Sequence, residues 1–153
     1  MHPQFSVFAH IGRPVEQVYE AVADPAQLSR YFTTGGARGR LETGATVHWD
    51  FADFPGEFPV EVVEATPPQR IVLRWDSNEP VKEGESARRT TVTFDFTATD
   101  DGRTRVEIGE IGWGDGDEGL RASYGNCMGW SQMLCALKAW LEHDINLREG
   151  MYV

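Results

Sequence analysis

Residues 117–146, DEGLRASYGNCMGWSQMLCALKAWLEHDIN, decide the fold. No proline interrupts these thirty residues, and apolar side chains recur among them at helical spacing. At about 1.5 Å per residue, a helix of this length would span about 45 Å. A small domain does not need so long a helix for packing alone. We therefore expect its apolar face to lie along an extended partner, namely a curved sheet.

The apolar face of this predicted helix is wider in its N-terminal half. At 100° per residue, one arc contains Leu120, Cys127, Trp130, Leu134, Leu137, Leu141 and Ile145. Tyr124, Met128 and Cys135 widen the arc on one side, but further along the same side carries Lys138 and Glu142. A cavity covered at one end by strands and loops would produce this pattern. Packing against short helices would produce it equally well.

Strand-like segments and two short helices precede the long helix. The helices are expected over residues 15–23 and 26–32. The expected strands are residues 5–11, 38–41, 46–51, 58–65, 69–76, 88–99 and 103–113, with turns at 53–57 and at Asp101-Gly102. Strands joined by tight turns predict an antiparallel sheet with the helices on one face. We expect one α+β domain over residues 1–153.

The composition argues against several classes of partner. A net charge of −10 disfavours nucleic acids and anionic membranes, since phosphate groups are bound by clustered Lys and Arg. No stretch approaches the roughly 20 apolar residues of a membrane span, and residues 1–4 do not resemble a signal peptide. We expect no membrane insertion.

The two cysteines, Cys127 and Cys135, lie on the same predicted helix. Their spacing of eight residues places them about 12 Å apart along the axis, too far for a disulfide. Free thiols favour a reducing compartment, so the cytoplasm is expected, and both are predicted to be buried structural thiols rather than nucleophiles.

Three segments carry a resemblance to a known family. Residues 11–32, IGRPVEQVYEAVADPAQLSRYF, resemble the opening signature of the START-like, or SRPBCC, superfamily. Residues 60–75, VEVVEATPPQRIVLRW, are similar to the central double strand of its branch named after the activator of the heat-shock protein 90 ATPase. The pattern from Gly129-Trp130 to Leu141 resembles that branch's last helix.

The resemblance implies a helix-grip fold of order β-α-α-β6-α, with a deep cleft between the sheet and the C-terminal helix. It does not imply one activity. The relatives include lipid and hormone binders, polyketide cyclases, resistance proteins that bind toxic natural products, and co-chaperones. A fold shared by so many activities is a poor guide to chemistry.

Sequence motifs for cofactors and nucleophiles are lacking. The histidines His2, His10, His48 and His143 have no ligand spacing, so no metal site is expected. Residues 112–119 are rich in glycine but acidic, which disfavours phosphate binding, and Gly-x-Ser-x-Gly does not occur. We expect no cofactor.

Glu110 is the one candidate for catalysis. Val106 and Ile108 set the inward phase of their strand, and Glu110 continues it by two residues. An inward carboxylate beside an apolar cleft could act as an acid or hydrogen-bond partner. A bulge at a neighbouring glycine would instead turn it outward.

The remaining candidates are ligand-binding residues of the cleft. They are Tyr31, Phe32, Trp49, Phe51, Trp75, Phe94, Phe96, Glu110, Tyr124, Met128 and Ser131. The aromatic residues on strands are expected to be core first and cleft wall second. Asp50 and Asp53 are expected at the surface or in turns.

These features lead to three functional hypotheses. The leading one is non-catalytic binding of a small hydrophobic or amphipathic molecule in the cleft. The second is an aromatase- or cyclase-like enzyme in which Glu110 transfers a proton. The third, which the family resemblance implies, is a chaperone-associated interaction protein, and a homodimer also remains open.

Overall fold

The computed structural model describes residues 1–153 and has the expected order of elements, β-α-α-β6-α. The elements are β1 (Gln4–Ile11), α1 (Val15–Ala23), α2 (Pro25–Tyr31), β2 (Gly36–Arg38), β3 (Thr46–Phe51), β4 (Phe54–Thr66), β5 (Arg70–Asp76), β6 (Arg89–Ala98), β7 (Thr104–Ile111) and α3 (Asp117–His143). The α+β helix-grip prediction is therefore confirmed.

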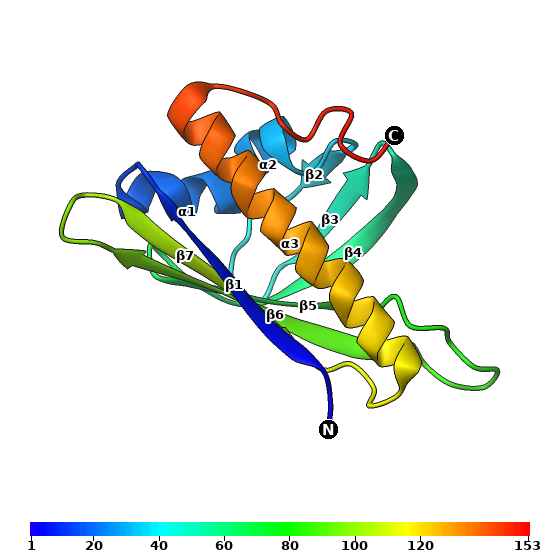
Figure 1. Cartoon of the computed structure of the whole chain (residues 1–153). Coiled ribbons are helices and arrows are strands. Elements are labelled where there is room, and N and C mark those ends of the chain that lie inside the picture. Colours follow the sequence, from blue (N-terminus) through cyan, green and yellow to red (C-terminus); the bar gives the residue numbers. More distant parts are fainter.

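All seven strands form one antiparallel sheet in the order β1-β7-β6-β5-β4-β3-β2. Alternate side chains point to the core, as Val92, Phe94 and Phe96 of β6 show by their burial. The register shifts between β3 and β4 and again between β4 and β5. Such irregularities increase the local twist, and the sheet curves around the last helix (Figure 1).

The long helix α3 crosses the concave face of the sheet, and α1 and α2 lie beside its C-terminal end (Figure 1). Its buried side chains, Trp130, Met133, Leu134, Ala136 and Leu137, join the same core as those of the strands. The two ends of α3 are held differently, and this difference positions the functional site.

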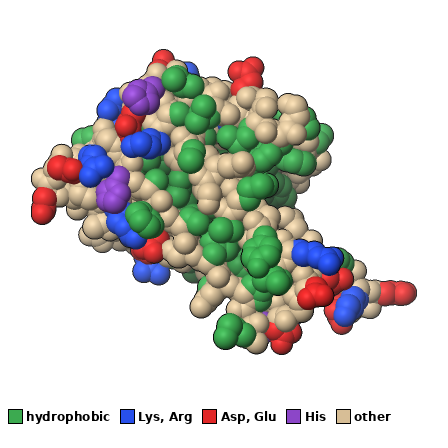
Figure 2. Space-filling model, in the orientation of Figure 1, with side chains coloured by type: hydrophobic (Ala, Val, Ile, Leu, Met, Phe, Trp, Pro, Cys, Tyr) green, Lys and Arg blue, Asp and Glu red, His purple; other side chains and the backbone are tan.

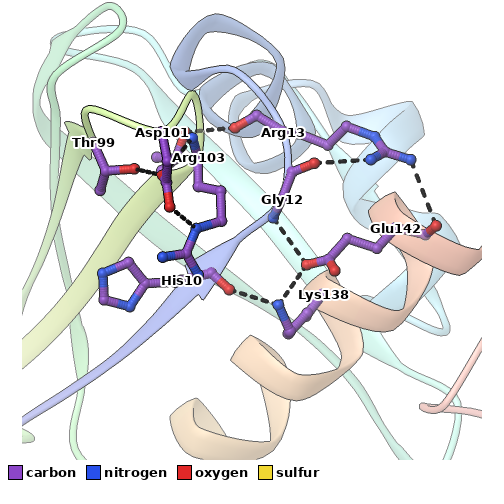
Figure 3. A network of polar contacts seen from close by, with 9 residues as sticks. His10, Gly12, Arg13, Thr99, Asp101, Arg103, Lys138 and Glu142 are labelled. Carbon is purple, nitrogen blue, oxygen red and sulfur yellow. Dashed lines mark hydrogen bonds and ion pairs between the residues drawn. The ribbon is translucent and has the colours of Figure 1, made fainter.

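The C-terminal end of α3 is fastened to β1 by polar contacts (Figure 3). Glu142 Oε2 accepts hydrogen bonds from the backbone N–H of Gly12 at 2.9 Å and from Lys138 Nζ at 2.6 Å. Lys138 Nζ also donates to the backbone carbonyl of His10 at 2.8 Å. These contacts, led by the Lys138 ammonium, hold the pKa of Glu142 below its ordinary value. This half of the helix lies close against the sheet.

Several predicted boundaries were wrong. The helix expected over 117–146 ends at His143, because Asp144 adopts a left-handed conformation with φ 54° and the chain turns back. The strand expected over 38–41 is Gly36–Arg38. The turn expected over 53–57 is shorter, since β4 already begins at Phe54 and pairs it with Phe51. An early start to β4 brings Phe54 to the site.

Candidate functional site

A cavity of about 680 Å³ lies between the sheet and the N-terminal half of α3. Its lining consists of Phe32, Phe51, Phe54, Trp75, Asn78, Pro80, Glu118, Arg121, Ala122, Gly125, Asn126, Met128, Gly129, Trp130, Met133, Arg148, Met151 and Tyr152. The volume lies within the range of about 300–1,000 Å³ that is usual for small-molecule sites. A second hollow of about 480 Å³ adjoins it and shares Trp75 and Asn126.

In the space-filling view, hydrophobic side chains gather along α3, and the surface is indented between the C-terminal segment and a charged lobe (Figure 2). The charged lobe lies where α3 begins and where the loop after β5 approaches it (Figures 1 and 2). The cavity is therefore open to solvent on one side of the helix.

The inner wall is a continuous group of aromatic rings. Trp130 of α3 stacks on Trp75 of β5 with ring centroids 5.4 Å apart, and on Phe32 at 5.6 Å. Phe32 in turn meets Phe51 edge to face at 5.1 Å. Rings that pack against one another this way cannot collapse freely into the space beside them. The rings therefore support one another, and the wall is largely rigid.

Small residues of α3 keep the space open. Ala122, Gly125 and Gly129 line the cavity at positions that share one face of the helix. A Cβ atom added at Gly125 or Gly129 would meet no heavy atom within 4 Å. No neighbouring backbone therefore requires glycine at these positions. Glycine inside a helix costs about 0.5–1 kcal/mol relative to alanine, so this part of α3 gives up stability and leaves volume unfilled.

Glu110 lies directly behind this wall. Its carboxylate is completely buried and accepts hydrogen bonds from neutral donors only. Oε1 accepts from Trp130 Nε1 at 2.8 Å, while Oε2 accepts from Trp75 Nε1 at 3.0 Å and from Thr90 Oγ1 at 2.6 Å. Asn126 Nδ2 lies within 3.1 Å of both oxygens. One carboxylate thus orients three residues of the cavity wall.

The C-terminal segment after α3 closes another side of the cavity. Arg148 forms a two-pronged ion pair with Asp53, with both N–O distances 2.7 Å, and its side chain is 5% exposed. Its guanidinium also lies 4.6 Å from the centre of the Tyr152 ring. Tyr152 hydrogen-bonds Gln132 of α3. The segment is therefore attached both to the β3–β4 turn and to the helix.

Asp53 lies in the turn between β3 and β4, in line with the expectation of a surface or turn position, and its side chain is only 9% exposed in this ion pair. Hydrogen bonds from the Arg148 guanidinium hold the pKa of Asp53 below its usual value. The partner was not visible in the sequence, since Arg148 is 95 residues away along the chain. The prediction that both cysteines are buried was wrong, because Cys135 is exposed and Cys127 is half-buried. Both thiols are free, as expected.

Four of the predicted ligand-binding residues line the cavity: Phe32, Phe51, Trp75 and Met128. Four others are buried outside it: Tyr31, Trp49, Phe94 and Phe96. Tyr31 donates its hydroxyl to the carbonyl of Ala21 and stacks on Trp140. Glu110 faces inward, as its strand phase predicted, but lies behind the lining rather than in it.

The two remaining candidates on α3 are not among the residues that line the cavity. Tyr124 is 66% exposed, and the Ser131 hydroxyl donates to the carbonyl of Cys127 one turn earlier. The apolar pattern of the helix predicted neither the small residues nor Asn126, which line the cavity from the neighbouring side. The sequence signal for the cavity side of the helix was its pair of glycines, because two glycines four positions apart inside a helix leave one face without side chains.

Two further observations concern metal ions and membranes. No three His, Cys, Asp or Glu side chains group together in a way that could hold a metal ion. No helix has the length and apolar character needed to cross a membrane.

A family model described as activator of Hsp90 ATPase homolog 1-like protein matches residues 13–142. The chain belongs to this family. The matched range includes both short helices, strands β2–β7 and nearly all of α3, and so most of the cavity wall. No protein with a curated description matches the sequence.

Solved structures share the fold of this family member. Protein MLL2253 from Mesorhizobium loti has a TM-score of 0.77 at 22% identity, over 94% of this chain and 99% of that one. The Aha1 dimer from Colwellia psychrerythraea has a TM-score of 0.70 at 19% identity, over 92% and 97%. DynU16, a putative protein in the dynemicin biosynthetic locus, has 0.73 at 25% identity, over 92% of this chain and 48% of that chain.

Proposed function

We propose that this member of the family binds a small, predominantly apolar molecule in the cavity between the sheet and the N-terminal half of α3. The observation that carries the proposal is the pair Gly125 and Gly129, which leave an aromatic-walled space unfilled without any packing need. A helix that served only to cover the core would gain stability from larger side chains at these positions.

The affinity would come mainly from removing apolar ligand surface from water. A ligand that buries about 200 Å² of apolar surface gains about 5 kcal/mol before the costs of immobilisation. The three lining methionines, Met128, Met133 and Met151, add adaptable contact area beside the rigid rings. This combination suits a flat or compact apolar molecule.

The geometry favours binding over catalysis by Glu110. A general acid or base must lie within hydrogen-bond reach of the group that it protonates or deprotonates. Glu110 has no exposed surface, and neutral donors of the wall surround both of its oxygens. A cyclase-like reaction would therefore need another residue, and the DynU16 neighbour supports this alternative only through its biosynthetic locus.

A chaperone-associated role is supported by the family's description alone. A homodimer in solution is similarly suggested by the Colwellia neighbour, which is described as a dimer. Stimulation of the ATPase of a heat-shock protein 90 from a bacterium would test the first of these. Light scattering of the purified chain would test the second.

Native mass spectrometry against libraries of fatty acids and fused-ring aromatic compounds tests the proposed binding. We expect one-to-one complexes with members that fit about 680 Å³, together with a change in tryptophan fluorescence, since Trp75 and Trp130 line the cavity. A protein that forms no complex with any library member, at unchanged fluorescence, contradicts the proposal.

A further inference from the structure

The side-chain amide of Asn126 is held in a single orientation. Its Nδ2 lies 3.1 Å from Glu110 Oε1 and 3.0 Å from Glu110 Oε2. A carboxylate that also faces two indole N–H groups and a hydroxyl donor acts here only as an acceptor. The amide nitrogen must therefore face Glu110, and rotation of the amide would place two oxygens against each other.

This orientation leaves the amide oxygen of Asn126 unused. Oδ1 accepts no hydrogen bond from the protein, and it is not a sealed buried atom. Asn126 lines both the main cavity and the adjoining hollow. A fixed acceptor thus lies where the two hollows adjoin.

The indole donors of the inner wall are already occupied. The indole N–H groups of Trp75 and Trp130 both bond to Glu110, and the guanidinium of Arg148 bonds to Asp53. The charged side chains of Glu118 and Arg121 are exposed at the start of α3, on the solvent side. A ligand group that reaches the two tryptophan rings therefore meets the Asn126 acceptor and no free indole donor, while the side chains of Asn78 and Arg121, which also line the cavity, are exposed.

We propose that Asn126 Oδ1 accepts a hydrogen bond from the ligand, so that the site selects apolar molecules carrying an O–H or N–H donor. The inference rests on the proposed function, because it concerns the same cavity. Glu110 is a positioning residue in this account. It turns the Asn126 amide but does not touch the ligand.

The test uses three probes of similar shape: 1-naphthol, 1-methoxynaphthalene and naphthalene. A net hydrogen bond contributes about 0.5–1.5 kcal/mol, so we expect 1-naphthol to bind the wild-type protein about 2- to 10-fold more tightly than 1-methoxynaphthalene. Dissociation constants come from calorimetry or tryptophan quenching. This comparison needs no variant and is independent of any folding defect.

Variants test whether Asn126 causes the preference for 1-naphthol. Asn126→Ala should reduce the naphthol-to-methoxynaphthalene ratio to about one, while naphthalene still binds. Asn78→Ala is the matched control, because Asn78 also borders both hollows but does not bond Glu110, and it should keep the ratio. Glu110→Gln should lower the ratio as well, since Gln offers both a donor and an acceptor to the amide. A merely structural role for Glu110 would weaken all three probes equally.

The outcomes separate this inference from the proposed function. Equal binding of the three probes by the wild type overturns the role of Asn126 and leaves apolar binding in the cavity intact. A preference for 1-naphthol that survives in Asn126→Ala also overturns it. A wild type that binds none of the probes or the library compounds contradicts both proposals.

Discussion

Trp130 Nε1 lies 2.8 Å from Glu110 Oε1, and this hydrogen bond joins the middle of α3 to β7 through a buried carboxylate. The same carboxylate accepts from Trp75 on β5, so the stacked rings of Trp75 and Trp130 share one anchor. The C-terminal half of α3 is held separately, because its residues Glu142 and Lys138 bond to the backbone of Gly12 and His10 at the end of β1 (Figure 3). The bonds to Glu110 keep the two tryptophan rings of the cavity wall in place.

Replacing Glu110 by glutamine should destabilise the protein. The amide of Gln has one acceptor oxygen, and its NH₂ group would face donors that now bond a carboxylate oxygen. Leaving a buried donor unsatisfied costs about 1–3 kcal/mol. Urea unfolding monitored by near-UV circular dichroism measures the loss. An unchanged unfolding free energy would show that the network does not anchor the wall.

Filling the cavity from α3 should abolish binding without loss of stability. Gly129→Leu places a side chain in open space, and a residue with higher helix propensity than glycine gains about 0.5–1 kcal/mol. Calorimetry with naphthalene and thermal unfolding measure the two effects. Cys135→Leu adds similar bulk on the exposed side of the same helix and should bind normally. Normal binding by Gly129→Leu would place the ligand elsewhere.

Removing Arg148 should release the C-terminal segment. Breaking a buried ion pair by deleting one partner costs about 3–5 kcal/mol, and we expect the low end because Asp53 can rehydrate once the segment detaches. Chymotrypsin should then cut Arg148→Ala after Leu147 much faster than the wild type.

Arg38→Ala is the control for this release. Arg38 pairs with Glu57 through a side chain that is 74% exposed, and exposed pairs contribute little. Its cleavage rate should match the wild type. Equal cleavage of Arg148→Ala and the wild type would mean that the ion pair does not hold the segment.

Acid should detach the same segment only at low pH. Hydrogen bonds from Arg148 lower the pKa of Asp53 in the folded protein relative to its ordinary value of 3.8. The stabilisation is therefore fully present above the ordinary value, and it is lost as the pH falls through the lowered pKa. Guanidinium ¹⁵N resonances of Arg148 should stay constant from neutral pH to about pH 4 and shift below it. Asp53→Asn should lack this transition, and a transition well above pH 4 would contradict the assignment.

The sequence predicted the order of elements and the main burial pattern, because both follow from local periodicity. The alternation of Val92, Phe94 and Phe96 places these residues in the core, and the hairpin at Asp101-Gly102 forms with Gly102 at φ 83°. The inward direction of Glu110 followed from the phase of Val106 and Ile108. A repeat of two residues in a strand, or of 3.6 in a helix, shows directly which side chains face the core.

The site depended on contacts that no local pattern carries. Asp53 and Arg148 meet only after the chain reverses at Asp144, and a reversal at a non-glycine residue has a weak sequence signal. Tyr124 and Met128 are exposed residues four positions apart on α3, yet only Met128 borders the cavity. The hollow lies beside the face of the helix that carries Gly125 and Gly129, and a pattern of apolar residues does not mark that face.

A crystal structure of the protein grown with 1-bromonaphthalene would show where an apolar molecule binds, because bromine can be located by its anomalous scattering. We expect a bromine peak between Trp130, Phe51 and the helix face at Gly129, with the positions of the aromatic rings unchanged. Bromine found only outside this space, with the space filled by shifted side chains of the protein, would contradict this expectation.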